Sequence, residues 1–219
     1  MLNELQASAA GTPKYIVVEG PIGAGKTTLT GRLALHLNAR EMLEDPGSNP
    51  FLPRFYQEPA RYALSAQLFF LLQRVQQVRD LNQRNLLSHV TVADFMLDKD
   101  PLFAQLNLEP EEYALYENVY RHMRPDAPTP DLVIYLQASP AVLVERVRRR
   151  RVDYERGLSL DYLTRLSDAY ARFFHEYSAA PLLIVNSDNL NFVDREADFE
   201  LLLQRMRALR GTREYFNLG

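Results

Sequence analysis

The stretch "YIVVEGPIGAGKTTLTGRLALHLN", residues 15–38, decides the fold of this chain. Its first five residues, Tyr15–Glu19, form a short run rich in β-branched side chains, which is typical of a strand buried on both faces. Leu29, Leu33 and Leu37 recur at steps of four, so they share one face of a helix. The stretch therefore predicts a strand, a glycine-rich turn and a helix in succession, which is the opening of an α/β fold with a parallel sheet.

The turn itself, "GPIGAGKT" at residues 20–27, matches the phosphate-loop pattern G-x-x-x-x-G-K-[ST] between a strand and a helix. Glycines let the backbone wrap a phosphate, while N–H groups and the helix N-terminus attract its charge. Lys26 adds a mobile cation and Thr27 a hydroxyl for Mg²⁺, and a turn needed only for packing would require neither. We expect ATP to be bound by Gly20, Gly23, Ala24, Gly25, Lys26, Thr27 and Thr28.

Further short apolar runs alternate with segments of helical periodicity along the chain. The runs lie near residues 90–93, 131–137 and 181–188, and long helical stretches begin at Pro59 and Glu109. This alternation is typical of βαβ units around a parallel sheet. We expect an α/β fold of the phosphate-loop NTPase type, with about five parallel strands, helices on both faces and an arginine-rich lid.

The composition limits the organisation and the setting of the chain. The 219 residues predict one domain, residues 1–219, in which residues 1–12 form a flexible extension. The absence of cysteine excludes disulfides and thiolate chemistry and agrees with a cytoplasmic protein. No export leader is apparent, and no apolar run approaches the roughly 18 residues of a membrane span. We therefore expect no membrane partner.

The segment "ERVRRRRVDYERG", residues 145–157, holds six arginines in a chain with a formal net charge of −3. Nucleic-acid binders usually carry a strongly basic domain, so we expect no nucleic-acid partner. Ser139 and Pro140 favour the start of a helix, which puts the arginines at its end. A solvated helix end, favoured by the helix dipole, is the alternative to a role in binding phosphate.

A polar pair lies within the apolar stretch "AQLFFLLQRVQQV" of the long helix after Pro59. Gln67 and Arg74 are seven residues apart and so lie nearly on one face. An amide and a guanidinium present hydrogen-bonding groups in planes that suit the edge of a nucleobase. The helix pattern equally allows side chains that reach solvent or pair with a carboxylate, so this alternative stays open.

Five ordered segments carry a resemblance to a known family: "EGPIGAGKTT", "NPFLPRFYQEP", "YALSAQLFFLLQR", "VADFMLDKDPLFA" and "RVRRRRVDYERGLSLDYL". Through them, residues 15–177 resemble the deoxynucleoside kinases. The resemblance implies transfer of a phosphoryl group from ATP to the 5′-hydroxyl of a deoxynucleoside, with deoxyguanosine or deoxyadenosine preferred. It also implies a homodimer through the helices that flank the acceptor site.

The resemblance further implies the residues of the acceptor site. Glu44 matches the general base that takes the 5′-hydroxyl proton, with Asp45 as second choice. Tyr56 and Glu155 match residues that hold the 3′-hydroxyl. The small Ala66 agrees with room for a purine. The side chains that match the base-reading trio are Gln67, Arg74 and Asp100.

The arginine segment matches the lid of this family, at about residues 146–157. Arg146 and Arg150 are four apart and share a helix face. The resemblance implies that one stacks on the ATP base while the other reaches the phosphates. Much of the family has another arginine where Val152 stands, and Arg151 is the neighbouring candidate for that role. The residues expected to act in catalysis are Glu44, Lys26, Arg146 and Arg150.

Asp94 follows a predicted strand and, with Thr27, is expected to hold Mg²⁺. Here the chain departs from the family pattern, because Phe95 and Met96 stand where arginine and serine are usual. A cation expected near the 5′-oxygen is therefore missing, and Lys99 is a candidate replacement.

Two other functions fit parts of these observations. A nucleoside monophosphate kinase of the thymidylate type shares the phosphate loop, but it needs cations for the acceptor's own phosphate. A regulator that binds nucleotide without turnover is the alternative outside the enzymes, and Phe95 and Val152 are its evidence.

Overall fold

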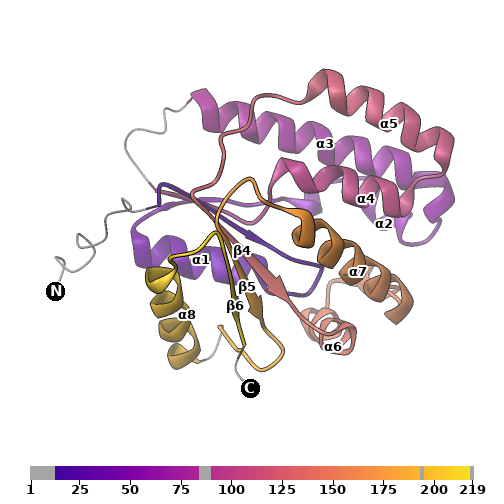
Figure 1. Ribbon diagram of the computed structural model, residues 1–219. Coiled ribbons are helices and arrows are strands. Elements are labelled where there is room, and N and C mark those ends of the chain that lie inside the picture. Colours follow the sequence, from indigo (N-terminus) through magenta and orange to yellow (C-terminus); the bar gives the residue numbers. More distant parts are fainter. Residues whose placement is uncertain (1–12, 84–89, 193–194, 218–219) are drawn as a thin grey trace.

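One parallel β-sheet forms the centre of the molecule (Figure 1). The computed structural model describes residues 13–83, 90–192 and 195–217, and the extension predicted for residues 1–12 lies outside them. Within the described residues the strands follow the order β2-β3-β1-β4-β5-β6. Their bounds are β1 (Tyr15–Glu19), β2 (Arg40–Met42), β3 (Thr91–Ala93), β4 (Leu132–Gln137), β5 (Leu182–Asn186) and β6 (Arg213–Phe216).

Strand β1 lies in the middle of this sheet and determines where a ligand can bind. It pairs in parallel with β3 on one side and with β4 on the other. The loops that leave β1 and β3 therefore start at one edge, the edge formed by the carboxyl ends of the strands. Open α/β sheets bind ligands beyond that edge where the strand order reverses. Residues 20–27 and Asp94 both follow strands there.

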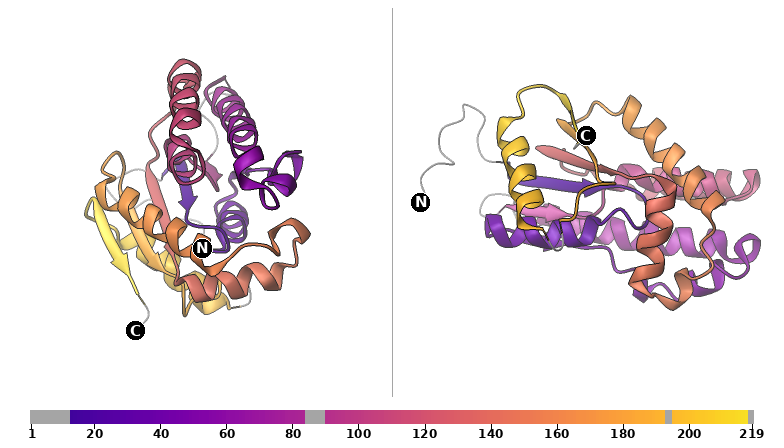
Figure 2. Two further views of the ribbon diagram at one scale, coloured as in Figure 1. Left: turned by 90° about the vertical axis from the view of Figure 1, so that its right-hand side faces the viewer. Right: turned by 90° about the horizontal axis from the view of Figure 1, so that it is seen from below.

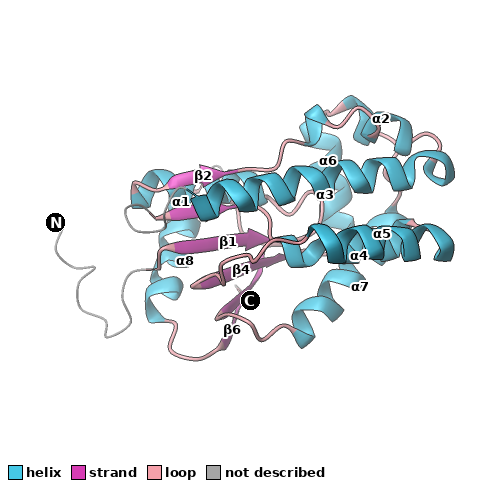
Figure 3. Cartoon of the chain, turned by 90° about the horizontal axis from the view of Figure 1, so that it is seen from above, coloured by secondary structure: helices cyan, strands magenta, loops and turns pink. Residues whose placement is uncertain are grey.

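Helices cover both faces of the sheet, as predicted. Figures 1 and 3 show α1 and α8 on one face and α3, α4 and α5 on the other. In Figure 2, α3 and α5 stand side by side and extend away from the sheet. The helices are α1 (Lys26–Leu37), α2 (Leu52–Phe55), α3 (Pro59–Gln83), α4 (Asp100–Asn107), α5 (Pro110–Met123), α6 (Pro140–Arg150), α7 (Leu160–Glu176) and α8 (Glu196–Ala208), with short 3₁₀ turns η2 (Pro46–Ser48), η3 (Leu97–Lys99) and η4 (Asp153–Glu155).

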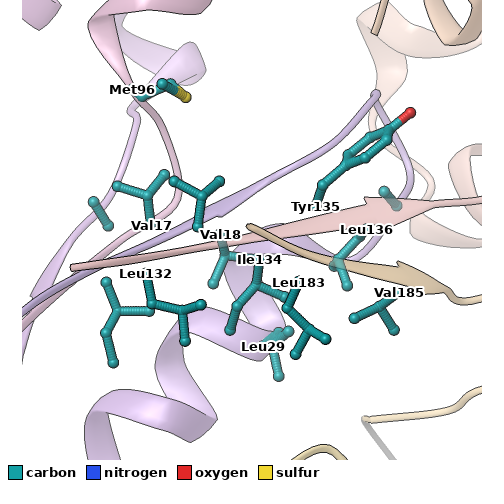
Figure 4. Close-up of a cluster of buried hydrophobic side chains, with 14 of the residues drawn as sticks. Val17, Val18, Leu29, Met96, Leu132, Ile134, Tyr135, Leu136, Leu183 and Val185 are labelled. Atoms are coloured by element: carbon teal, nitrogen blue, oxygen red, sulfur yellow. The ribbon is translucent and has the colours of Figure 1, made fainter. Parts of the chain in front are cut away.

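The hydrophobic core surrounds β1, the strand that leads into the phosphate loop. All five residues of β1 are buried, which confirms the predicted doubly covered strand. Figure 4 shows Ile134 and Leu183 on the side of Leu29 from α1, while Tyr135 points to the opposite face. Burying one such aliphatic side chain contributes about 1.5–3 kcal/mol. The start of the phosphate loop is therefore rigid.

The sheet is parallel, as predicted, but within the described residues it has six strands where about five were expected. Strand β6 lies at the edge beside β5, and among its four residues Phe216 alone is buried. Because one face of this strand is largely open, its sequence lacks an apolar run of the kind that predicted β1, β3, β4 and β5, and the short β2 lacks one too. Within the described part of the chain, no helix has both the length and the apolarity to traverse a bilayer.

Candidate active site

The phosphate loop has a backbone that requires glycine at three points. Gly20 has φ +154°, and a Cβ there would lie 2.5 Å from the carbonyl oxygen of Leu136. Gly23 has φ +87°, and its Cβ would lie 3.0 Å from the carbonyl oxygen of Leu143. Helix α1 then begins after Gly25, whose φ is +97° and which offers no side-chain cap. The N–H groups of the first turn are thus left for a phosphate.

The side chain of Lys26 hydrogen-bonds to the backbone at the start of this loop. Its Nζ donates to the carbonyl oxygen of Gly20 at 2.8 Å and to that of Pro21 at 3.3 Å. Burial, followed by the positive charge of Lys99, lowers the pKa of Lys26. An anion bound in the loop would offset both effects. Ala24 is buried below the loop, while Thr28 is exposed.

Thr27 and Asp94 meet as predicted at the end of the phosphate loop. Thr27 Oγ1 donates to Asp94 Oδ2 at 2.6 Å, and the backbone N–H of Glu44 donates to Asp94 Oδ1 at 2.8 Å. In the part of the chain that is described, no group of three or more His, Cys, Asp or Glu side chains could form a metal site. One hydroxyl and one carboxylate instead suit Mg²⁺, which keeps waters and takes phosphate oxygens as further ligands.

Glu44 lies at the centre of a set of ion pairs. Its Oε1 accepts from Arg74 Nε at 2.7 Å and Nη2 at 2.6 Å, and Lys99 Nζ lies 3.3 Å away. Burial alone would raise the pKa of Glu44, but the positive charges of Arg74, Lys99 and Lys26 outweigh it and lower the pKa to about 2. Glu44 is therefore a carboxylate at neutral pH. Asp45 is exposed and accepts from the backbone N–H of Ser48.

Arg74 links Glu44 to the far end of the pocket. Its Nη1 donates to Asp100 Oδ2, and the hydroxyl of Tyr116 donates to Asp100 Oδ1. Asp100 is completely buried behind Arg74. Burial opposes the charge of Arg74, but Glu44 and Asp100 together raise its pKa further. The guanidinium is thus held in one plane, with carboxylates on two sides.

One pocket connects the phosphate loop to this ion-pair network. Gln67 lines it and is 6% exposed, which excludes the alternative that this side chain reaches solvent. Gln67 Nε2 is buried without a hydrogen-bond partner in the described structure. Such a donor costs about 1–3 kcal/mol unless a ligand satisfies it. The residues around the pocket include Lys26, Thr27, Glu44, Tyr56, Ala66, Gln67, Phe70, Arg74, Asp94, Lys99, Phe103, Asn107, Arg150, Glu155 and Tyr162.

The arginine segment divides between two places. Arg150 donates to both carboxylate oxygens of Glu155, its Nε lying 3.2 Å from Oε2, and both side chains line the pocket. Arg146 instead donates through Nη2 to the carbonyl oxygen of Ser187 at 2.5 Å, in the loop after β5. Helix α6 ends at Arg150, and the next residue, Arg151, has φ +55° and is exposed. The prediction of arginines at a helix end is confirmed. The side chains of Arg146 and Arg150 bind different partners.

The lid segment also touches the acceptor side of the pocket. The rings of Tyr154 and Tyr56 stack, with centroids 6.1 Å apart and planes at 7°. Glu155, 6% exposed, lies behind them. Tyr56, Glu155 and Arg150 therefore surround one end of the pocket, although they come from segments about 100 residues apart.

Sequence reasoning missed several pocket residues. Phe103, Asn107 and Tyr162 line the pocket from α4 and α7. Phe103 and Tyr162 lie in two of the segments that carry the resemblance, but no role was assigned to them, and Asn107 belongs to an ordinary helical pattern. Glu19 carries a stronger signal: a carboxylate at the end of an otherwise apolar buried strand needs a partner, and Lys99 Nζ lies 3.0 Å from it.

A phosphate loop at the edge of a parallel sheet, with a carboxylate facing it in one pocket, defines a phosphotransferase of the phosphate-loop class. The family model described as deoxynucleoside kinase matches residues 16–209, and the chain belongs to that family. The family predicted from the five sequence segments is thus confirmed, and the chain is an enzyme.

Relatives and solved structures agree with this assignment. The chain is 30% identical to deoxyguanosine kinase of Bacillus subtilis over 203 residues, covering 90% of this chain and 98% of that one. It is 33% identical to deoxyadenosine kinase of Lactobacillus acidophilus over 213 residues, covering 90% and 97%. Its fold is similar to that of M. mycoides deoxyadenosine kinase with bound dCTP, with a TM-score of 0.77 and 21% identity over 89% of this chain and all of the other.

Proposed function

We propose that this enzyme transfers the γ-phosphoryl group of ATP to the 5′-hydroxyl of a purine deoxynucleoside, forming a deoxynucleoside monophosphate and ADP in nucleotide salvage. One observation carries the proposal. A single pocket is lined by Lys26 and Thr27 of the phosphate loop, by Glu44 and by Gln67, whose buried Nε2 has no hydrogen-bond partner in the described structure. The names of the two relatives, a deoxyguanosine and a deoxyadenosine kinase, support a purine acceptor.

Glu44 is the proposed general base. As the 5′-oxygen bonds to the γ-phosphorus, the bond from that phosphorus to the β,γ-bridging oxygen breaks and the hydroxyl proton passes to Glu44. The low pKa of Glu44, about 2, keeps it ionised to orient the hydroxyl. In a loose transition state the proton moves late, so orientation matters more than basicity.

The donor end supplies positive charge and backbone donors. Lys26 and the N–H groups at the start of α1 would hold the β- and γ-phosphates. Arg150 would neutralise charge on the transferring group, and Arg146 would pack beside the ATP base near the loop after β5. Thr27 and Asp94 fit Mg²⁺, which when bound neutralises the phosphate oxygens.

The acceptor end is proposed to read both sugar and base. Tyr56 and Glu155 would hold the 3′-hydroxyl. The stacking of the Tyr56 ring on Tyr154 of the lid favours this role, because it fixes the position of Tyr56. Gln67 and Arg74, the latter oriented by Asp100, would bind the edge of the base. Ala66 is buried and small, which leaves room for a purine between Phe70 and Phe103. The base contacts are therefore Gln67 and Arg74, while Asp100 is completely buried, does not line the pocket and acts by positioning Arg74.

The pocket chemistry weighs against a nucleoside monophosphate kinase. A phosphorylated acceptor would bring its own negative charge to the region of Glu44 and Glu155, both of which are carboxylates already paired with arginines. A regulator without catalysis would bind ATP but release no ADP. Membership of the deoxynucleoside kinase family favours a deoxynucleoside kinase over both alternatives.

We also propose that the enzyme is a cytoplasmic homodimer. Leu72 on α3 and Leu115 on α5 are large apolar side chains with exposed fractions of 49% and 52% on adjacent helices. A second copy of the chain would cover them. The absence of cysteine suits a reducing compartment. Light scattering tests the dimer: the wild type should have twice the chain mass, and Leu72→Glu with Leu115→Glu should have the mass of one chain.

The proposed reaction is tested by initial rates of ADP formation from Mg·ATP. The acceptors are deoxyguanosine, deoxyadenosine, deoxycytidine and thymidine, and Lys26→Ala gives the background. The proposal requires turnover with a purine deoxynucleoside that the variant lacks. If no nucleoside is phosphorylated while ATP still binds, the proposal is wrong.

A further inference from the structure

Lys99 is a buried cation in the proposed active-site pocket to which no part of the reaction described above has been assigned. The chain has three lysines, and two of them, Lys26 and Lys99, line this one pocket. Lys99 is 1% exposed and lies at the end of η3, the turn between β3 and α4. A lysine is almost never buried to this extent unless it is paired.

Glu19 holds Lys99 against the base of the phosphate loop. Lys99 Nζ lies 3.0 Å from Glu19 Oε1, and Glu19 itself is completely buried at the end of β1. The carboxylate of Glu19 also accepts from the backbone N–H of Met96 at 2.8 Å, from that of Gly20 at 3.1 Å and from the hydroxyl of Tyr170 at 3.2 Å. Lys99 is therefore positioned by the same residue that leads into the phosphate loop.

A purely structural role does not account for this pair. Replacing a buried ion pair by apolar residues of similar volume is often neutral or stabilising. The neighbouring Phe95, Met96 and Leu97 are all buried apolar residues, so the surroundings would accept one more. Retaining two buried charges there is explained if one of them meets a ligand.

The ammonium group faces the reacting end of the pocket. Lys99 Nζ lies 3.3 Å from Glu44 Oε1, the oxygen that also pairs with Arg74. An ammonium has three N–H donors, and the ion pairs to Glu19 and Glu44 account for two within the described structure. A hydroxyl bound to Glu44 would therefore lie beside Lys99.

The positive charge of Lys99 lowers the pKa of Lys26, as the second cause after burial, so the two cations lie close enough to interact in this pocket. Two like charges in a water-poor site are costly until an anion lies between them. A phosphoryl group that passes from the phosphate loop to a hydroxyl on Glu44 is such an anion. It would meet Lys26 on the donor side and Lys99 on the acceptor side.

We propose that Lys99 is a further catalytic residue of this kinase, whose ammonium group binds the transferring phosphoryl group beside the attacking 5′-oxygen, and that Glu19 is its positioning residue. This inference rests on the proposed function. The oxygen–phosphorus bond forms, the bond to the β,γ-bridging oxygen breaks and the hydroxyl proton goes to Glu44, while Lys99 keeps its protons. The cation absent at Phe95 is thus supplied from four residues further along the chain.

The test compares Lys99→Met, Glu19→Gln and the double variant Lys99→Met with Glu19→Gln. Burial already raises the pKa of Glu19, and Lys99→Met leaves this completely buried carboxyl group without its cation, so the Tm should fall by roughly 10 °C. The double variant removes both charges and keeps one of the two oxygens that accept from the N–H groups of Met96 and Gly20, so its Tm should return most of the way to that of the wild type. Its kcat should nevertheless stay roughly 100-fold low, the usual effect of losing one donor to a transition state. The KM values for ATP and for the nucleoside should change little.

The outcomes separate the two proposals. A double variant with wild-type Tm and wild-type kcat would overturn the role of Lys99 and leave the proposed function intact. A double variant with wild-type Tm, normal ATP binding by calorimetry and low kcat supports the catalytic role of Lys99. A wild-type enzyme that phosphorylates no nucleoside overturns the proposed function, and the role of Lys99 fails with it.

Discussion

The two ends of the pocket are built in different ways. The donor end is made mainly of backbone: eight consecutive residues, 20–27, with glycines at positive φ and the first turn of α1. The acceptor end is made of side chains that come from the loop after β2, from α2, α3, η3, α4 and α7, and from the lid, and ion pairs connect several of them. A backbone site depends on local sequence, whereas a side-chain site depends on how distant segments pack.

This difference predicts how each end fails when it is changed. At the donor end, the loss of one cation or one glycine would disrupt the whole phosphate site. At the acceptor end, each side chain contributes to one property, such as proton transfer or base recognition. Substitutions can therefore separate kcat, KM and stability at the acceptor end but not at the donor end.

The largest expected effect is loss of the donor cation. Lys26→Ala should lower kcat/KM for ATP by at least 1,000-fold, about the size of effect given by a single charge that stabilises a phosphoryl group in transfer. The exposed Lys14→Ala is the matched control and should retain wild-type rates. Steady-state ADP release measures both. Equal rates for Lys26→Ala and Lys14→Ala would contradict the account of the donor end.

The next effect is loss of the proposed base. Glu44→Gln should lower kcat by roughly 100- to 10,000-fold, the range of general base catalysis. The KM for ATP should change little, because the phosphate loop is untouched. Glu41→Gln, an exposed carboxylate three residues earlier, is the control. Single-turnover kinetics make the comparison, and a Glu44→Gln enzyme as fast as the control would assign the base to another residue.

A smaller effect separates binding from stability. Gln67→Leu should raise the KM for a purine deoxynucleoside roughly 10- to 100-fold, because a pocket amide that binds the base is lost. The same change should leave Tm unchanged or raise it, because the unpaired Nε2 is removed. Gln76→Leu on the exposed face of α3 is the control. A fall in Tm with no change in KM would mean that Gln67 is a structural residue.

The smallest effect concerns stability against pH. The pKa of Glu44 is lowered to about 2 in the folded protein, against about 4.3 when unfolded. Its contribution to stability is therefore fully present above pH 4.3 and is lost as pH falls through 2. Denaturant unfolding at pH 3, 5 and 7 should show that the wild type loses more stability toward pH 3 than Glu44→Gln does. The same loss in both proteins would contradict the low pKa.

The sequence was sufficient for the donor end and for most of the fold. Strand β1 and helix α1 follow from local patterns, and residues 20–27 need no tertiary information. The acceptor end was reached through resemblance, since Glu44 and Arg74 are 30 residues apart and meet only in the folded chain. Asn107 and Tyr162 were missed because helical periodicity does not distinguish a pocket-facing polar residue from a surface one.

The positions of Arg146 and Lys99 have the same explanation. Sequence spacing put Arg146 and Arg150 on one face, but Arg146 is drawn to the carbonyl oxygen of Ser187 while Arg150 pairs with Glu155. Lys99 was a candidate for the missing cation on sequence alone, and the fold places it between Glu19 and Glu44. In both cases the deciding partner is far away in the sequence.

The most direct test of the account is the identity of the acceptor. Deoxyguanosine and deoxyguanosine monophosphate are offered together with Mg·ATP, and ³¹P NMR follows the products. The account predicts that deoxyguanosine monophosphate accumulates at the rate of ADP release and that no deoxyguanosine diphosphate forms. A diphosphate that forms from the monophosphate, with deoxyguanosine left unchanged, would contradict the claim that this pocket binds a nucleoside hydroxyl.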